Sequence, residues 1–206
     1  MLADRGRMGA AGVSTGGIGG IDAYTKLYLP MTGDDASTVF LDSGQNDISD
    51  GLLGDACGYF DGTGDYLSVP DHADWDFGTG DCTIELWVYN VSAGNAFIIA
   101  TGPEWNTSSF AIYNVDGSGW VFRLGTVEQY YATLSEGAWH HVAMVRSSGS
   151  MTSYVDGVIV TPTNIANPIA NVTSVTTTYG VSLSASTDGS LSGRVGYMDE
   201  VRISDT

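Results

Sequence analysis

The chain has 206 residues, 43% of them hydrophobic and 15% charged, with 24 acidic residues against seven basic ones. That length and apolar content suit a single globular domain with a full core and argue against a disordered chain. The net charge of −17 argues against DNA or RNA as a partner, and the lack of an apolar run of roughly 20 residues argues against a membrane span.

The first segment is rich in glycine, with seven glycines among residues 1–20 and little apolar mass. Because such a segment has no core of its own, we predict a flexible anchoring arm over residues 1–21 and one domain over residues 22–206. We expect Arg5, Arg7 and Met8 to anchor the arm on a partner subunit. No apolar stretch follows the charged start, so no secretory signal peptide is expected.

From Tyr24 onward, short alternating segments are separated by Gly, Asn, Asp and Ser turns, which is typical of β-strands. The predicted strands are residues 25–30, 58–61, 65–69, 82–90, 96–101, 109–115, 119–125, 128–133, 139–147, 150–155, 158–160, 178–184 and 193–203. A single short helical turn is predicted near residues 73–75. Many short strands at this spacing predict an all-β fold, an antiparallel sandwich of two sheets.

Cys57 and Cys82 are the two cysteines of the chain. The sequence cannot show whether their Cα atoms lie close enough for a bridge. Without a signal peptide, two reduced thiols are favoured over a disulfide.

Several sequence phrases resemble one known family when they are taken in order and at their spacing. They are Tyr59–Pro70, Gly80–Tyr89, Trp139–Arg146, Tyr154–Gly157 and Gly193–Ile203. Together they resemble laminin-G-like, concanavalin-A-like lectin/glucanase domains. The resemblance covers roughly residues 22–206 and implies a jelly-roll sandwich, a fold that hosts both sugar binders and enzymes.

The start of the domain is similar to the opening of such domains in bacteriophage structural proteins, over Asp22–Leu29, Gly33–Thr38 and Phe40–Gly44. This resemblance implies a virion protein, in a capsid decoration, tail or fibre, that is assembled in the host cytoplasm and released by lysis. The arm would hold it on other virion subunits as a homo-oligomer, and the sandwich would display a face for host-surface or environmental glycans. The alternative is a free carbohydrate-binding module of a secreted or multi-domain glycan-active protein.

Glu85 is the first candidate for catalysis, because glucanases of this fold place two carboxylates at alternate positions of one strand. Alternation puts Trp87 and Tyr89 on the same face as Glu85. Neither side chain can protonate a leaving group or attack a sugar carbon, so we expect a protein without enzymatic activity.

The resemblance also implies a structural calcium ion. Asp199 is the expected carboxylate ligand, with Asp61 or Asp22 as the second. Carboxylate and carbonyl oxygens are the ligands that calcium prefers. Pairing of Asp199 with Arg202, without any metal, is the alternative.

His140 and His141 are adjacent on a predicted strand and therefore point to opposite faces. No cysteine–histidine spacing supports zinc, so we expect one ring inside the sandwich and the other outside. The sequence singles out no Ser-His-Asp arrangement, because no serine lies on a Gly-x-Ser-x-Gly turn.

Sugar recognition needs a flat apolar face for stacking and polar groups for the hydroxyls. Aromatic residues of predicted hairpins meet the first requirement, although aromatics on alternating strands also serve the core. The candidates are Trp105, Tyr113, Trp120, Tyr130 and Tyr131.

Overall fold

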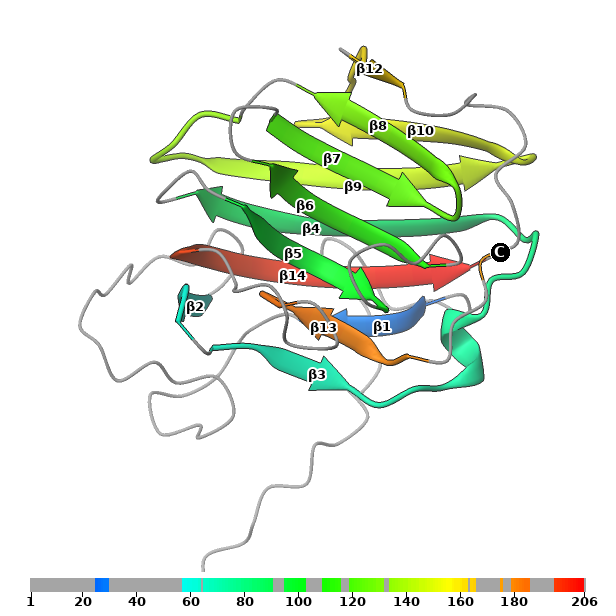
Figure 1. The fold of residues 1–206 in the computed structure, drawn as a ribbon, viewed down its shortest axis with the longest axis horizontal. Coiled ribbons are helices and arrows are strands. Elements are labelled where there is room, and N and C mark those ends of the chain that lie inside the picture. Colours follow the sequence, from blue (N-terminus) through cyan, green and yellow to red (C-terminus); the bar gives the residue numbers. More distant parts are fainter. Residues whose placement is uncertain are drawn as a thin grey trace, which may run out of the picture.

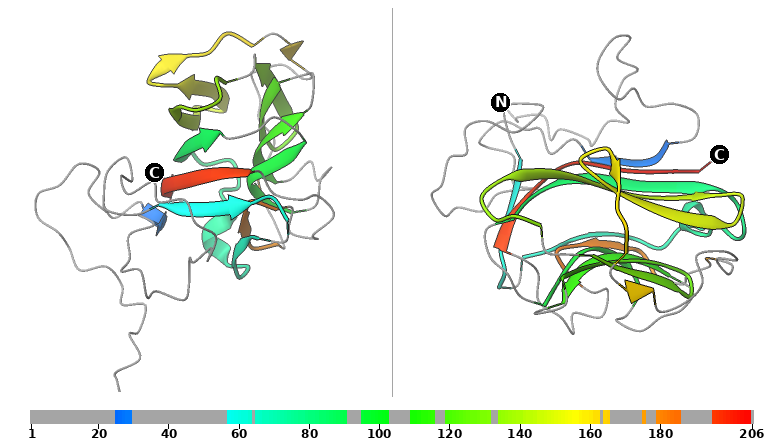
Figure 2. Two further views of the ribbon diagram at one scale, coloured as in Figure 1. Left: turned by 90° about the vertical axis from the view of Figure 1, so that its left-hand side faces the viewer. Right: turned by 90° about the horizontal axis from the view of Figure 1, so that it is seen from above.

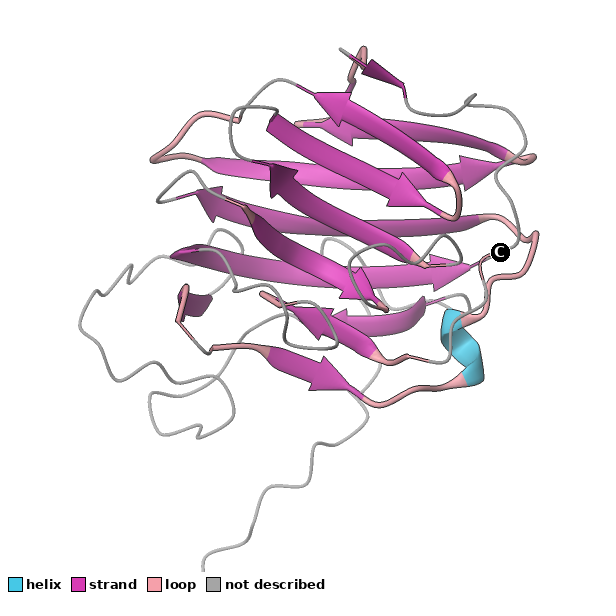
Figure 3. Ribbon diagram, viewed as in Figure 1, coloured by secondary structure: helices cyan, strands magenta, loops and turns pink. Residues whose placement is uncertain are grey.

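The computed structural model describes residues 25–29, 57–63, 65–90, 95–102, 109–115, 119–131, 134–162, 164–165, 175, 179–185 and 195–205. These residues form fourteen β-strands and one short 3₁₀ helix, η1 (Ala73–Trp75), so the predicted all-β fold and the predicted helical turn are confirmed (Figures 1 and 3). The proposed arm over residues 1–21, the candidate ligand Asp22 and the candidate aromatic Trp105 lie outside the described residues.

The strands form two antiparallel sheets of seven strands each, counted over the described residues. Sheet A has the order β1-β14-β4-β9-β10-β11, and β2 also pairs with β14. Its strands are β1 (Thr25–Leu29), β2 (Gly58–Asp61), β4 (Cys82–Asn90), β9 (Trp139–Ser147), β10 (Ser150–Val155), β11 (Val158–Ile159) and β14 (Val195–Asp205). The right-hand view of Figure 2 shows the two sheets as stacked layers.

Sheet B has the order β12-β8-β7-β6-β5-β13-β3. Its strands are β3 (Leu67–Val69), β5 (Ala96–Thr101), β6 (Phe110–Val115), β7 (Gly119–Leu124), β8 (Val127–Tyr131), β12 (Asn164–Ile165) and β13 (Val181–Leu183). β12 is an edge strand that the sequence pattern did not predict, and its two residues pair with β8.

The main core lies between the sheets, and β4 shows how the sequence builds it. Alternate residues of β4 point to opposite faces of sheet A. Those that enter the core, with at most 1% of their surface exposed, are Ile84, Leu86 and Val88. Those on the outer face, all half-buried, are Glu85, Trp87 and Tyr89. The predicted division of this strand into two faces is therefore confirmed.

The turn between β10 and β11 is a two-residue hairpin made by Asp156 and Gly157. Both residues have positive φ, 52° and 75°. A type I′ turn needs positive φ at both central residues, and its twist matches that of the flanking strands. Asp-Gly is a preferred pair for such a turn, so the local sequence specifies this hairpin.

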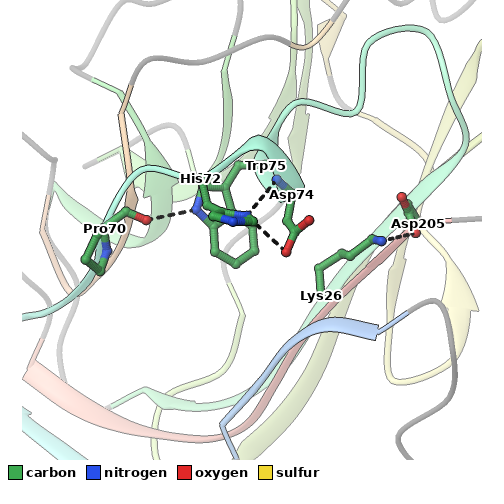
Figure 4. A network of polar contacts seen from close by, with 6 residues as sticks. All are labelled: Lys26, Pro70, His72, Asp74, Trp75 and Asp205. Atoms are coloured by element: carbon green, nitrogen blue, oxygen red, sulfur yellow. Dashed lines mark hydrogen bonds and ion pairs between the residues drawn. The ribbon is translucent and has the colours of Figure 1, made fainter.

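One end of the sandwich is closed by η1. Trp75 is 3% exposed and belongs to the main core, and its indole N–H donates to the carbonyl of Pro70 at 3.1 Å (Figure 4). Nearby, Lys26 of β1 forms an ion pair with Asp205 of β14 at 3.2 Å (Figure 4). These two contacts hold the edge of sheet A and the helical turn in place.

Arg146 of β9 is a buried cation that organises the loop before β4. Its side chain is enclosed, with 1% of the residue exposed. The guanidinium donates to the carbonyls of Gly80 at 2.5 Å, Gly78 at 3.0 Å and Phe77 at 3.4 Å. A buried charge is tolerated when hydrogen bonds of this kind replace its hydration.

The two cysteines are free thiols, as predicted. Cys82 pairs with Asp205 at one end of β14, whereas Cys57 precedes Gly58, which pairs with Met198. The two positions are thus separated along β14 and cannot be bridged. Burial raises the pKa of each thiol to about 11, so both remain protonated at neutral pH.

Gly180 allows β13 to lie against β3. A Cβ atom at this position would overlap the carbonyl oxygen of Val69 and lie 2.9 Å from the carbonyl carbon of Pro70. Both obstacles are backbone atoms, so neither can move aside as a side chain can. The absence of a side chain at this position is therefore a requirement of the β13–β3 pairing.

We predict that Gly180→Ala lowers the free energy of unfolding by about 3 kcal/mol, because the added methyl group overpacks a backbone contact. Urea denaturation measures this change. Gly149→Ala is the matched control: its Cβ meets nothing within 4 Å, and its φ of +78° predicts a cost of about 1 kcal/mol. Equal losses in the two variants would show that the Gly180 contact does not constrain the fold.

Candidate carbohydrate-binding face

Four aromatic rings form a row across the outer face of sheet A. Tyr197 of β14 pairs in register with Tyr59 of β2 and with Tyr89 of β4, and Tyr89 pairs with Trp139 of β9. The ring centroids are 4.8 Å apart for Tyr59–Tyr197, 5.8 Å for Tyr89–Tyr197 and 5.6 Å for Tyr89–Trp139. We call Tyr59, Tyr197, Tyr89 and Trp139 the aromatic row.

A second group of side chains lies beside the aromatic row on the same face. The Trp87 and His141 rings are 5.1 Å apart. The Glu85 carboxylate lies 3.4 Å from Nε2 of His141 and 3.6 Å from Nη1 of Arg202. We call Glu85, His141 and Arg202 the charged cluster. Each of these three side chains is about a quarter exposed, so each can reach a ligand on the face.

The charged cluster shifts the ionisation of Glu85. The hydrogen bond from His141 is the largest cause that lowers the Glu85 pKa, and the charges of His141 and Arg202 lower it further. Burial opposes this shift but does not reverse it. Glu85 is therefore an ionised carboxylate at neutral pH, a hydrogen-bond acceptor rather than an acid.

Two of the five predicted sugar-stacking residues are core residues instead. Trp120 is fully buried and Tyr131 is 1% exposed, and both belong to the main core between the sheets. Tyr131 donates its hydroxyl hydrogen bond to Gln129. A ring enclosed in the core cannot stack on a ligand, so this part of the prediction is wrong.

Tyr113 and Tyr130 lie together on the outer face of sheet B. Both hydroxyls donate to the carboxylate of Glu128, at 3.3 and 3.1 Å. Arg123 approaches the same carboxylate at 3.7 Å, and its guanidinium lies 5.6 Å from the Tyr113 ring centroid. Burial, and after it the Glu128 charge, raises the pKa of Tyr113.

The side chains at the centre of this outer face of sheet B are buried. Tyr113 is 7% exposed and Arg123 is 3% exposed. Apolar neighbours in a second small core cluster are buried as well: Phe97, Ala100, Ala111 and Val121. The Tyr113–Tyr130 pair is thus part of a packed polar network. In the aromatic row on sheet A, Tyr197 is 6% exposed, and the half-buried rings of Tyr59, Tyr89 and Trp139 are its accessible part.

The carboxylates expected to hold calcium do not converge. Asp61 pairs with Val195, four residues before Asp199 on β14, a separation of about 13 Å along an extended strand. Asp199 is 1% exposed, and its Oδ1 accepts the Glu200 N–H at 2.8 Å. No group of three or more His, Cys, Asp or Glu side chains that could hold a metal occurs in the described part of the chain. The structure therefore does not bring Asp61 and Asp199 together, and the calcium ion stays a prediction.

The adjacent histidines diverge, as predicted. His141 pairs with Trp87 and faces outward, where it joins the charged cluster. His140 pairs with Val88 and turns to the opposite side, where its ring contacts Ser135 and Asp156 near the start of β9. The side chain of His140 is 14% exposed.

Sequence reasoning missed most of the candidate site. The residues not proposed as ligand contacts are Tyr59, Tyr89, Trp139, Tyr197, His141 and Arg202. Each belongs to a phrase that carried the family resemblance. The signal that could have found them is cross-strand pairing, because outward positions of neighbouring strands in one row form a continuous surface. That signal requires the register, which the sequence alone does not give.

Two packed antiparallel sheets are the architecture of jelly-roll domains, lectin domains among them. The family model described as the concanavalin A-like lectin/glucanases superfamily (Laminin_G_3) matches residues 61–206. The chain belongs to this superfamily, and the predicted resemblance to it is confirmed. No curated protein sequence matches the chain.

Solved structures support the same fold at low identity. Domains LG4-5 of the mouse laminin alpha1 chain are 17% identical with a TM-score of 0.54, and the match covers 74% of this chain and 41% of that one. Trypanosoma rangeli sialidase in complex with 2,3-difluorosialic acid is 12% identical with a TM-score of 0.52, over 71% of this chain and 24% of the sialidase. The match thus spans less than half of either relative. No helix among the described residues has the length and apolarity that a membrane crossing requires.

The charged cluster predicts a pH dependence of stability. The Glu85 pKa is lowered from its usual value of 4.5 on folding, so ionised Glu85 stabilises the fold fully above that pH. This contribution is lost as the pH falls through the folded pKa. We expect the free energy of unfolding to fall less for Glu85→Gln than for the wild type between about pH 6 and about pH 3. Urea denaturation at both pH values measures this, and parallel losses would contradict it.

Proposed function

We propose that the outer face of sheet A binds carbohydrate without cleaving glycosidic bonds. The observation that carries the proposal is the aromatic row: four rings from four different strands are in contact, and Tyr59, Tyr89 and Trp139 are half-buried and accessible beside the buried Tyr197. Sugar rings present flat arrays of C–H groups, and aromatic faces are the protein surfaces that match them. Membership of the lectin/glucanases superfamily supports a sugar ligand.

The charged cluster supplies the polar half of such a site. Sugar hydroxyls are both donors and acceptors, and Glu85 offers accepting oxygens while His141 and Arg202 offer N–H donors. Glu85 contacts both His141 and Arg202, so the three side chains are already ordered before a ligand binds. This preorganisation favours binding of a defined saccharide over nonspecific adhesion.

The same cluster argues against glycoside hydrolysis on this face. Hydrolysis uses two carboxyl groups, one of which must be protonated to act as an acid. Glu85 is kept ionised by its two basic neighbours, and its neighbours on the same face of β4 are Trp87 and Tyr89. The proposal is therefore a binding module rather than a glycosidase.

We predict that Trp139→Ala weakens glycan binding about tenfold, equivalent to about 1.4 kcal/mol, because it removes the end of the aromatic row. A glycan array identifies a ligand for the wild type, and calorimetry compares the two proteins. Tyr66→Ala is the matched control, since Tyr66 is 60% exposed and lies outside the aromatic row. Binding that survives Trp139→Ala, or a wild type that binds no glycan, would overturn the proposed site.

A finer proposal concerns where the module acts. We propose that it is a virion surface protein held by its first 21 residues, with the sandwich displayed outward. What supports this is the resemblance of Asp22–Leu29 and the following phrases to phage structural proteins. The arm also differs in charge from the rest: Arg5 and Arg7 lie in the first 20 residues, while the whole chain carries −17.

We expect a chain without residues 1–21 to keep glycan binding and the cooperative unfolding of the sandwich but to lose attachment to the particle. The measurement is co-sedimentation with virions that lack this subunit, using the full chain for comparison. Substitution of Arg5, Arg7 and Met8 together by Ala is expected to reduce attachment in the same assay. If the truncated chain still attaches, the anchoring role of the arm is wrong, while the glycan-binding proposal is unaffected.

A further inference from the structure

Ser135, His140 and Asp156 form a hydrogen-bonded chain where β9 begins and β10 ends. Oγ of Ser135 lies 2.8 Å from Nε2 of His140, and Nδ1 of His140 lies 2.9 Å from Oδ2 of Asp156. Ser135 lies in the segment before β9, His140 is the second residue of β9, and Asp156 lies in the β10–β11 hairpin. The order of atoms is that of a nucleophile, a base and a carboxylate that orients the base.

The backbone holds the carboxylate of Asp156 in this position. Its Oδ1 accepts the N–H of His141 at 2.9 Å, and the Asp156 N–H donates to the carbonyl of His141 at 2.8 Å. Asp156 also has a φ of 52°, which the hairpin turn imposes. The second carboxylate oxygen, Oδ2, is thereby aimed at the His140 ring.

This geometry determines the tautomer of neutral His140. An ionised carboxylate can only accept hydrogen bonds, so Nδ1 of His140 carries the hydrogen that is donated to Asp156. Nε2 then presents its lone pair and accepts the hydroxyl hydrogen of Ser135. His140 is therefore placed to remove the proton of Ser135, while Asp156 acts as a positioning residue.

We propose that Ser135 is a nucleophile that accepts acyl groups from carboxylic esters. Oγ of Ser135 attacks the carbonyl carbon as Nε2 of His140 takes its proton, and the ester C–O bond breaks as the alcohol leaves with that proton. Water then hydrolyses the acyl-serine by the same base, which releases the acid and restores Ser135. Ester and water give acid and alcohol, so no other reactant is needed. Ser135 is exposed and accessible to such a substrate.

The test uses the full chain and a fluorophosphonate probe, which phosphonylates activated serines with loss of fluoride. We expect a single adduct on Ser135 by peptide mass spectrometry, and none on the exposed serines Ser68 and Ser147. Ser135→Ala is expected to abolish labelling while leaving the His140–Asp156 contact in place. With p-nitrophenyl acetate, the wild type is expected to release one equivalent of p-nitrophenol in a burst that Ser135→Ala lacks.

The His140→Ala variant distinguishes a catalytic role of His140 from a purely structural one. We expect the labelling rate to fall about a hundredfold, the usual contribution of a general base, and to be partly restored by imidazole in solution. Restoration by a free base would not follow from a purely structural role of His140. An unlabelled wild type, or a labelling rate that is equal in the wild type and in Ser135→Ala, would overturn the proposal. These probes carry no sugar, so their outcome is independent of glycan binding.

Discussion

The β-bulge at Asp199 and Glu200 is the constraint on which both the core and the candidate site depend. The register between β14 and β4 shifts between Asp199 and Arg202, and Glu200 has a φ of 50°. Tyr197 and Arg202 are five residues apart, so in a regular strand they would point to opposite faces. The extra residue lets Tyr197 join the aromatic row and Arg202 join the charged cluster. Asp199 supports this turn by accepting the N–H of Glu200.

The same bulge keeps the core continuous. Met198 and Ile203 are also five residues apart, and both are buried between the sheets. Without the bulge, one half of β14 would expose its apolar residues and bury its polar ones. An acidic pair in the middle of β14 forms the bulge that prevents this mismatch: Asp199 is buried and Glu200 adopts the left-handed conformation. Asp199 thus has a structural role in forming the bulge.

The strands were predictable because apolar residues alternate and Gly or Asp marks the turns, as in Cys82–Asn90, whose bounds agree with the prediction. Which residues of β6 and β7 point into the core, and which point outward, was not predictable. Every residue of β7 is buried, so both of its faces are apolar and alternation does not distinguish the core side from the outer side. Trp120 and Tyr113 therefore looked equivalent in sequence, although they lie on opposite faces of sheet B. Likewise, Asp156 is brought to His140 by the β10–β11 hairpin and Ser135 by the segment before β9, and local patterns place these segments without orienting their side chains.

The charge of the molecule bears on which sugars the aromatic row would suit. The chain carries −17 with seven basic residues, and the basic groups on this face, His141 and Arg202, are paired with Glu85. A sulfated or uronic-acid-rich glycan would meet a repulsive overall field and no uncommitted cation in the charged cluster. A neutral sugar is not subject to that repulsion, and stacking on the aromatic row uses only its C–H faces. Charge repulsion and stacking together therefore favour a neutral saccharide as the partner of the proposed face.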